Sequence, residues 1–130
     1  TMRSASRAHQ RVTIVSTDLA RALEHAVAMR GAFHATVVHA ARPVAAAGSA
    51  RSADAFVVDL AGGASVVEVR ALIDAHPGAA FVFIAAELPL RHAIARIIAD
   101  AGHAAVPAAE HPLVVQATLV ALLRPTVAAG

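Results

Sequence analysis

The stretch AFVVDL, residues 55–60, decides the fold: it holds five apolar residues and one carboxylate, that of Asp59. An apolar run of this length without helical spacing is typical of a strand that is buried on both faces. Similar short runs are RVTIVS (11–16), HATVVHA (34–40), AAFVFIAA (79–86) and HAAVPA (103–108). Because these runs are mostly continuously apolar rather than alternating, they predict five parallel strands in one sheet.

Stretches of helical period separate these strands. Thr17 or Asp18 is a suitable N-cap for a helix to about residue 30, and Leu19, Leu23 and Val27, four apart, predict its buried stripe. Further helices are predicted at about 65–75, 89–100 and 112–124, with a short, weak one within 43–52. Five strand–helix units with right-handed crossovers give an α/β, doubly wound, flavodoxin-like (βα)5 sandwich.

Composition narrows the class of protein. The 130 residues suit one domain (11–124), preceded by a basic arm (1–10) and followed by a tail (125–130). Hydrophobic residues make up 58% of the chain and charged residues 15%, which argues against disorder. The absence of Cys excludes thiol catalysis and disulfides and fits a cytoplasmic protein. No apolar run approaches the roughly 18 residues of a membrane span. The net charge is only +2, so the basic arm is the one segment whose charge favours binding to nucleic acid.

Ligand sites in such a fold lie at the carboxyl ends of the strands. Asp59 ends the third strand, and the sequence leaves two interpretations open: a phosphoacceptor, active or vestigial, or an ordinary strand-end carboxylate. Asp18, after the first strand, is more typical of a helix N-cap than of a metal ligand. The eight His residues include no pair with the i, i+4 helical spacing of a zinc motif, so they predict structural or surface roles.

The element order and three motifs resemble one known family. FVVD (56–59) closes the third strand, ADAG (99–102) precedes the fifth, and HPLVVQATLVALL (111–123) forms the last helix. Together they resemble the receiver domains of bacterial two-component response regulators, the CheY-like family, over about residues 11–124. The resemblance implies a phosphoacceptor Asp after the third strand and two acids after the first that hold Mg²⁺. It also implies a Ser or Thr and a Lys that bind the phosphoryl group.

This chain departs from that pattern at every position except one. Asp59 matches the phosphoacceptor, but Ser16 and Thr17 stand where the acid pair belongs, with Asp18 next as a weak candidate metal ligand. Ala85 stands at the Ser/Thr position, and Ala108 or Ala109 at the Lys position, in a chain that has no Lys. A phosphoaspartate carries roughly two negative charges, which need cationic partners. We therefore expect no cofactor, doubtful Mg²⁺ binding, and a pseudo-receiver without conventional phosphorylation.

The last helix predicts a protein contact. Its apolar residues surround almost the whole circumference, so we expect Val115 and Leu122 to face outward. Arg91 and Arg96 of the preceding helix would pair with acids across a two-fold axis, which predicts a homodimer through the last two helices. The alternative is that Ala and Val simply stay exposed in an Ala-rich chain.

These observations favour a non-catalytic signalling domain that acts by protein–protein interaction, alone or fused to an effector. One alternative is a slow phosphoacceptor that uses Asp59 in a phosphorelay with a histidine kinase. Another is a flavodoxin-like small-ligand binder or enzyme that uses the strand-end crevice. No helix-turn-helix segment is evident, which argues against DNA binding by this domain alone.

Overall fold

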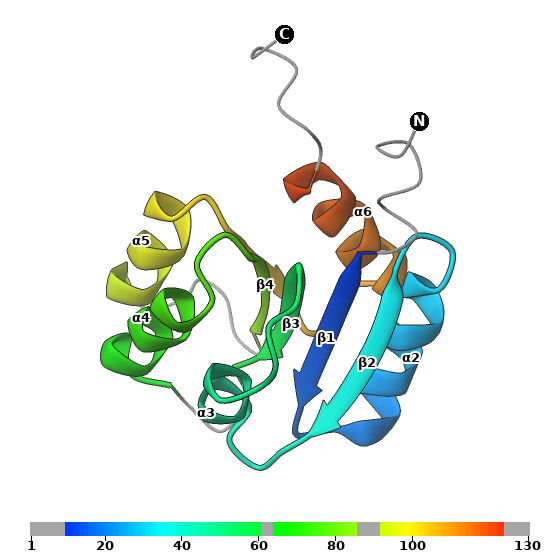
Figure 1. Cartoon of the computed structure of the whole chain (residues 1–130), viewed down its shortest axis with the longest axis horizontal. Helices are drawn as coiled ribbons and strands as arrows, with labels where there is room; N and C mark the ends of the chain where they lie inside the picture. The colour runs from blue at the N-terminus through cyan, green and yellow to red at the C-terminus, as the bar shows by residue number, and fades with distance from the viewer. Residues whose placement is uncertain (1–9, 61–63, 86–91, 124–130) are drawn as a thin grey trace, which may run out of the picture.

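The fold is a five-stranded parallel sheet with helices on both faces (Figure 1). This computed structural model describes residues 10–60, 64–85 and 92–123. In chain order the elements are β1 (Arg11–Ser16), α2 (Leu19–Met29), β2 (His34–His39), α3 (Pro43–Gly48), β3 (Ala55–Asp59), α4 (Val66–Ala75), β4 (Ala80–Ala85), α5 (His92–Asp100), β5 (Ala104–Pro107) and α6 (Pro112–Leu122). The predicted fold class is confirmed.

Two of the predicted segments cannot be compared with the structure. The tail at 125–130, and all of the basic arm except its last residue, lie outside the described residues. Within the described ranges, no helix is long and apolar enough to cross a bilayer.

The strand order β2-β1-β3-β4-β5 places β3 at the centre of the sheet, between β1 and β4. The register aligns the carboxyl ends of the strands: Ser16 pairs with His39, Asp59 with Ile84, and Ala85 with Pro107. Residues that follow the strands therefore meet at one edge of the sheet, as parallel pairing requires.

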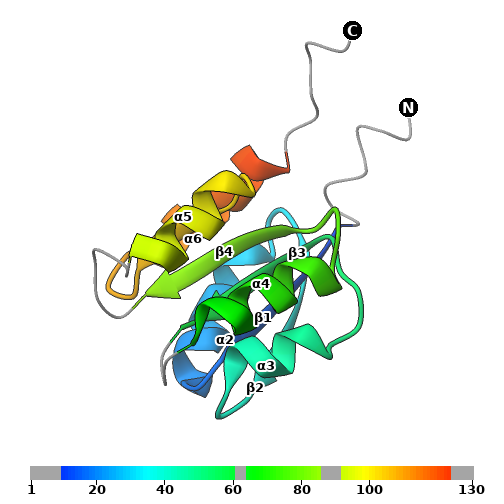
Figure 2. The same cartoon turned by 90° about the vertical axis from the view of Figure 1, so that its left-hand side faces the viewer.

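Two hydrophobic cores lie on opposite faces of the sheet. Figure 1 shows the helices on its two sides, and Figure 2 looks onto the side of α3, α4 and α5. Helices α2 and α6 cover one face, over residues such as Ile14 and Val57. Helices α3, α4 and α5 cover the other, where Phe56, Phe81 and Phe83 are fully buried. Successive side chains of a strand point to opposite faces of the sheet and so pack into both cores. This explains why these strands are continuously apolar.

The predicted buried stripe of α2 is wrong. Leu19, Leu23 and Val27 are 45%, 50% and 60% exposed. The buried residues of α2 are instead Ala22, His25, Ala26 and Met29. Because α2 packs on both the sheet and α6, its small Ala side chains form the contact face and allow close approach, and the bulkier stripe is turned away.

The expected orientation of α6 is also wrong for Val115. Its side chain is 0% exposed and belongs to the core with Leu119, while Leu122 is half-buried against that same core. The exposed large residues of α6 are Leu113 and Val114. Since α6 is apolar around its circumference, its sequence does not distinguish the face that meets the sheet.

Candidate functional site

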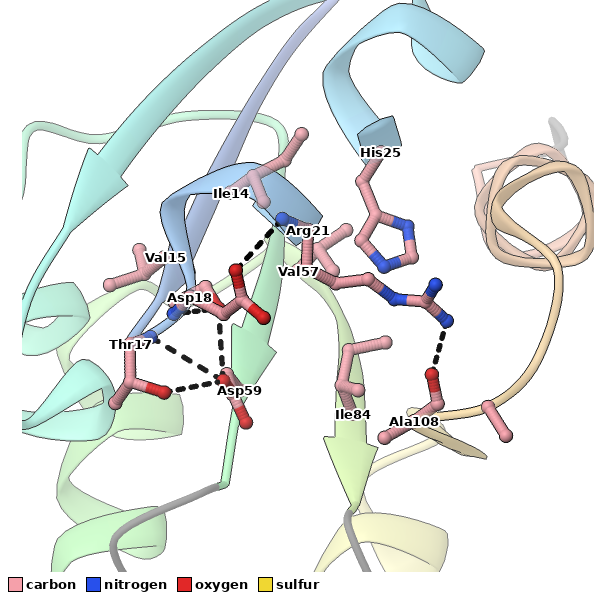
Figure 3. Close-up of a pocket in the computed structure, with 12 residues that line it drawn as sticks. Ile14, Val15, Thr17, Asp18, Arg21, His25, Val57, Asp59, Ile84 and Ala108 are labelled. Carbon is pink, nitrogen blue, oxygen red and sulfur yellow. Dashed lines mark hydrogen bonds between the residues drawn. The ribbon is translucent and has the colours of Figure 1, made fainter. Parts of the chain in front are cut away.

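A cavity of about 460 Å³ opens at the carboxyl edge of the sheet (Figure 3). Its residues come from β1, the β1–α2 turn, α2, β3, β4 and the segment that follows β5. They are Ile14, Val15, Ser16, Thr17, Asp18, Arg21, His25, Val57, Asp59, Ile84, Ala108 and Ala109. The structure thus brings together the strand-end residues of β1, β3 and β5 that the sequence predicted for this edge.

The carboxylate of Asp59 is held by the turn that follows β1. Its Oδ2 accepts hydrogen bonds from Ser16 Oγ at 2.9 Å, Thr17 Oγ1 at 3.2 Å and Thr17 N at 3.4 Å. Ser16 Oγ in turn accepts from Asp18 N at 3.0 Å. Hydrogen bonds to an ionised carboxylate are stronger than neutral ones. The two residues at the acid-pair positions therefore bind Asp59 directly.

The same residues do not fit the magnesium site that the resemblance implies. Mg²⁺ takes carboxylate oxygens and water in a strict octahedral arrangement. Here hydroxyl groups occupy both acid-pair positions, and Asp18 Oδ1 accepts from Arg21 N at 3.1 Å, which makes Asp18 the N-cap of α2. The described part of the chain contains no group of three or more acidic or His side chains placed to hold a metal.

Arg21 contributes the cation of this cavity. Its Nη2 donates to the backbone carbonyls of Ala108 and Glu110, the latter at 3.0 Å, and its Nη1 donates to Glu24 Oε1 at 3.4 Å. The side chain thus ties α2 to the segment between β5 and α6. The sequence analysis missed this role, because the two carbonyl acceptors lie 87 and 89 positions away and backbone carbonyls leave no mark in a sequence.

His25 lies on α2 one turn beyond Arg21 and is 3% exposed. Neither of its ring nitrogens has a hydrogen-bond partner among the described residues. Burial, assisted by the positive charge of Arg21, lowers the pKa of His25 against the weaker opposing effect of Glu24 and Asp59. The ring is therefore neutral at pH 7. Nothing in the sequence distinguished His25 from the other seven histidines.

Arg96, the other described cation considered from the sequence, lies away from this site. Arg96 is exposed on α5, and its Nε lies 3.8 Å from Asp100 Oδ2 of the same helix. Arg91 lies outside the described residues. Of the predicted interface residues, Leu122 and Val115 pack in the core beneath α6, so neither reaches the cavity.

His25 should make the stability of the domain depend on pH. Its pKa is below the ordinary 6.5 in the folded chain, so the unfolded chain binds a proton that the folded chain does not. The free energy of unfolding should therefore fall as the pH decreases through about 6.5. We expect His25→Leu to raise the free energy of unfolding by about 1–3 kcal/mol, because the substitution removes a buried polar group that has no hydrogen-bond partner among the described residues. The free energy of unfolding should also depend less on pH in this variant.

Urea unfolding at pH 7.5 and 5.5 measures both effects. A smaller pH dependence should persist in the variant, because burial also lowers the pKa of His103. Equal stability and an unchanged pH dependence in His25→Leu would contradict the prediction.

No family model matches the chain, and a search of curated proteins finds no match. Solved structures do match it. The pilus assembly protein CpaE from Caulobacter crescentus CB15 superposes with a TM-score of 0.69 at 16% identity, covering 88% of this chain and 93% of that one. The beryllofluoride-activated receiver domain of DrrB, from Thermotoga maritima, gives 0.69 at 12% identity over 90% and 99%. An adenylate cyclase from Rhodopirellula baltica gives 0.70 at 12% identity over 89% and 88%. The chain therefore has the fold of a CheY-like receiver domain.

Proposed function

We propose that this domain is a pseudo-receiver, a non-catalytic signalling domain that acts by binding other proteins without conventional phosphorylation of Asp59. The observation that carries the proposal is the state of the Asp59 carboxylate. Ser16 and Thr17 donate three hydrogen bonds to its Oδ2 from the positions where a phosphorylated receiver would hold a metal ion.

The charges around Asp59 support the same conclusion. A phosphoryl group on Asp59 would bring roughly two negative charges into a cavity that Asp18 also lines. The position that would supply a hydroxyl is Ala85, and the position that would supply an ammonium is Ala108 or Ala109; their methyl groups neutralise no charge. Arg21 Nη2 is already held by two carbonyl oxygens, so the acyl phosphate would lack the partners that stabilise it.

Intact mass after incubation with acetyl phosphate, with and without Mg²⁺, tests the proposal directly. We expect no added phosphoryl group on the folded protein. A Mg²⁺-dependent adduct that is absent from Asp59→Asn would overturn the proposal. It would also establish the second candidate function, a slow phosphoacceptor that receives its phosphoryl group from a histidine kinase. The placement of Asp59, half-buried at the end of β3 and lining the cavity, favours that candidate.

The names of the similar structures suggest how the domain is used. One is a pilus assembly protein and another an adenylate cyclase, and both contain this fold. We propose by analogy that the present domain serves, in the cytoplasm, as the regulatory part of a larger assembly, through a fused or separate effector.

We also propose that the protein contact includes a homodimer through α5 and α6. Val115 is excluded from that interface by its burial, whereas Arg96 is exposed and Leu122 is half-buried. Val114, 40% exposed and eight positions before Leu122 on α6, lies on the same side of that helix and adds apolar surface to it. Leu113 instead lines a groove with Val27 of α2.

The double variant Arg96→Glu/Val114→Glu should convert the dimer to a monomer in light scattering, because both changes place a charge on the proposed interface. The matched control is Leu23→Glu/Val27→Glu, which places two charges on the exposed stripe of α2. We expect the control to remain dimeric. If only the α2 variant dissociates, the dimer uses the other helix and the proposed interface is wrong.

A further inference from the structure

Strand β2 forms one edge of the sheet, and α2 packs against one of its faces (Figure 1). At the start of β2, His34 N donates to Gln10 O at 2.9 Å, which begins the ladder to β1. In a parallel strand, each residue that bonds to its neighbour is followed by one whose peptide groups face the other way. The N–H and C=O groups of Ala35 and Val37 therefore point away from β1, and no described residue bonds to them.

The β2 edge lacks the features that protect exposed strands. Natural edge strands are short, or they carry a charged side chain, a Pro or a bulge that prevents another strand from pairing. The opposite edge strand, β5, has four residues and ends at Pro107. Strand β2 has six residues without Pro, Asp, Glu, Lys or Arg, and it pairs with β1 without interruption. Of the two edges, β2 is therefore the one open to a further strand.

An apolar stripe of α2 borders the same edge. Arg21 reaches the segment before α6, so it marks the side of α2 that faces α6. Leu19 and Leu23 each lie two positions from Arg21, a rotation of roughly 200°, which places them on the side away from α6. Strand β2 lies on that side, because α2 contacts β1 and β2 whereas α6 contacts β4. At 45% and 50% exposure, both leucines are open to the side chains of an added strand.

A charge at one end of this surface narrows the class of partner. Arg30 directly follows α2, is exposed, and lies seven positions after Leu23, so it projects on nearly the same side. It lies near the amino end of β2, and none of the ion pairs among the described residues includes it. An acidic residue of a partner would complement this charge. A second copy of β2, paired antiparallel, would instead bring Arg42, the first charged residue after that strand, towards the same end.

We propose that β2 binds an extended segment of another protein as an antiparallel edge strand, an addition that is common in otherwise parallel sheets. Directly opposite residues of an antiparallel pair share a face and, in the bonded positions, exchange both hydrogen bonds. Ala35 and Val37 pack on the core under α2, so the residues opposite them also lie on the α2 side. These residues of the segment are apolar and extend over the α2 stripe, and an acidic residue follows at the carboxyl end, beside Arg30.

The inference rests on the proposed function, because it names a surface and a class of protein partner for a domain that acts by binding proteins. The two are measured separately. Peptide binding at β2 does not involve Asp59, and uptake of a phosphoryl group from acetyl phosphate does not involve the β2 edge. Either result can therefore fail without the other.

A fluorescent peptide, Ser-Val-Thr-Val-Thr-Val-Glu-Glu, tests the geometry on the whole chain. N-methylation of its last two Val residues removes N–H groups that would bond to β2, whereas N-methylation of its two Thr residues removes N–H groups that face away from β2. In fluorescence anisotropy we expect the Val-methylated peptide to bind at least about tenfold more weakly than the parent, and the Thr-methylated peptide within about twofold of it. No binding of the parent at about 1 mM, or equal effects of the two methylations, would overturn the proposal.

Matched substitutions establish where the peptide binds. Ala35→Pro removes an N–H that points away from β1, so the domain should stay folded while binding weakens about tenfold or more. Leu23→Ser should weaken binding about threefold or more, whereas Leu113→Ser, the same change at a leucine of α6 that is 54% exposed, should not alter it. Arg30→Glu should weaken binding, and a peptide that ends in Lys-Lys should bind this variant more tightly than it binds the unsubstituted chain.

Amide hydrogen exchange gives a readout on the unsubstituted chain, which keeps the test decisive if Ala35→Pro does not fold. Saturating peptide should slow exchange at Ala35 and Val37, because their N–H groups then donate to the added strand. Exchange at Thr36, which lies between them and already bonds to β1, should change least. Unchanged exchange at Ala35 and Val37, or equal binding of the peptide by Leu23→Ser and Leu113→Ser, would place the peptide elsewhere and refute the site.

Discussion

Replacing Val115 with Asp should leave the domain largely unfolded at neutral pH. Val115 is 0% exposed in the core between α6 and the sheet, together with Leu119 and Val12. An ionised carboxylate in apolar surroundings without a partner costs several kcal/mol, and protonation relieves only part of that cost. Domains of this size have a free energy of unfolding of about 5–15 kcal/mol, so one such substitution removes most or all of that stability.

The matched control is Val67→Asp, which makes the same chemical change at a side chain of α4 that is 76% exposed. We expect its free energy of unfolding to stay within about 0.5 kcal/mol of the unsubstituted chain. Circular dichroism and urea unfolding, both at low protein concentration, compare the two variants. A folded Val115→Asp with an unchanged urea midpoint would place Val115 at the surface, as the sequence had predicted, and would return it to the proposed dimer interface.

Rebuilding the missing groups around Asp59 should create a phosphorylation site. The variant Thr17→Asp/Ala85→Thr/Ala108→Lys places a second carboxylate, a hydroxyl and an ammonium group at positions taken from the receiver resemblance, with Ala108 as one of the two positions that it offers for the Lys. A carboxylate pair favours Mg²⁺, and the ammonium group offsets the charge of the phosphoryl group. Removing Thr17 Oγ1 also takes away one of the donors that hold Asp59 Oδ2.

We expect this variant to take up a phosphoryl group from acetyl phosphate in the presence of Mg²⁺, and we expect the unsubstituted chain to take up none. Intact mass measures the uptake, and adding Asp59→Asn to the same variant should abolish it. Ala108→Lys alone is the second control and should remain unmodified, because it lacks the metal-binding carboxylate pair. A folded triple variant that stays unmodified would show that these three side chains are not what prevents phosphorylation.

The strands were predicted well because the sequence carries their signal locally. Each predicted run contains its strand within one or two residues at either end, and AFVVDL contains β3 with Asp59 as its last residue. The ends of several helices are also marked by local sequence signals. Asp18 caps α2 through Arg21 N, and Gly102, which follows α5, has the positive φ of 78° that is typical of a glycine at a helix C-terminus.

The orientation of two helices was not predictable in the same way. The face that a helix buries depends on its neighbours, and α2 meets the sheet and α6 through Ala22 and Ala26 rather than through the larger Leu23. Arg21 and His25 were missed for a related reason. Their significance comes from segments nearly ninety positions away or from the lack of a partner, and neither leaves a pattern in the sequence.

The two cores also differ in when the chain can complete them. The core under α3, α4 and α5 uses buried residues only from Val15 to Ile98, whereas the core under α2 needs Val115 and Leu119 from the last helix. A ribosome releases the chain from its N-terminus. The core under α3, α4 and α5 can therefore form before α6 has been synthesised, while Ile14 and Val57 on the other face are not yet covered by α6. We therefore expect nascent chains that stop before residue 112 to expose that face and to be the species that chaperones bind.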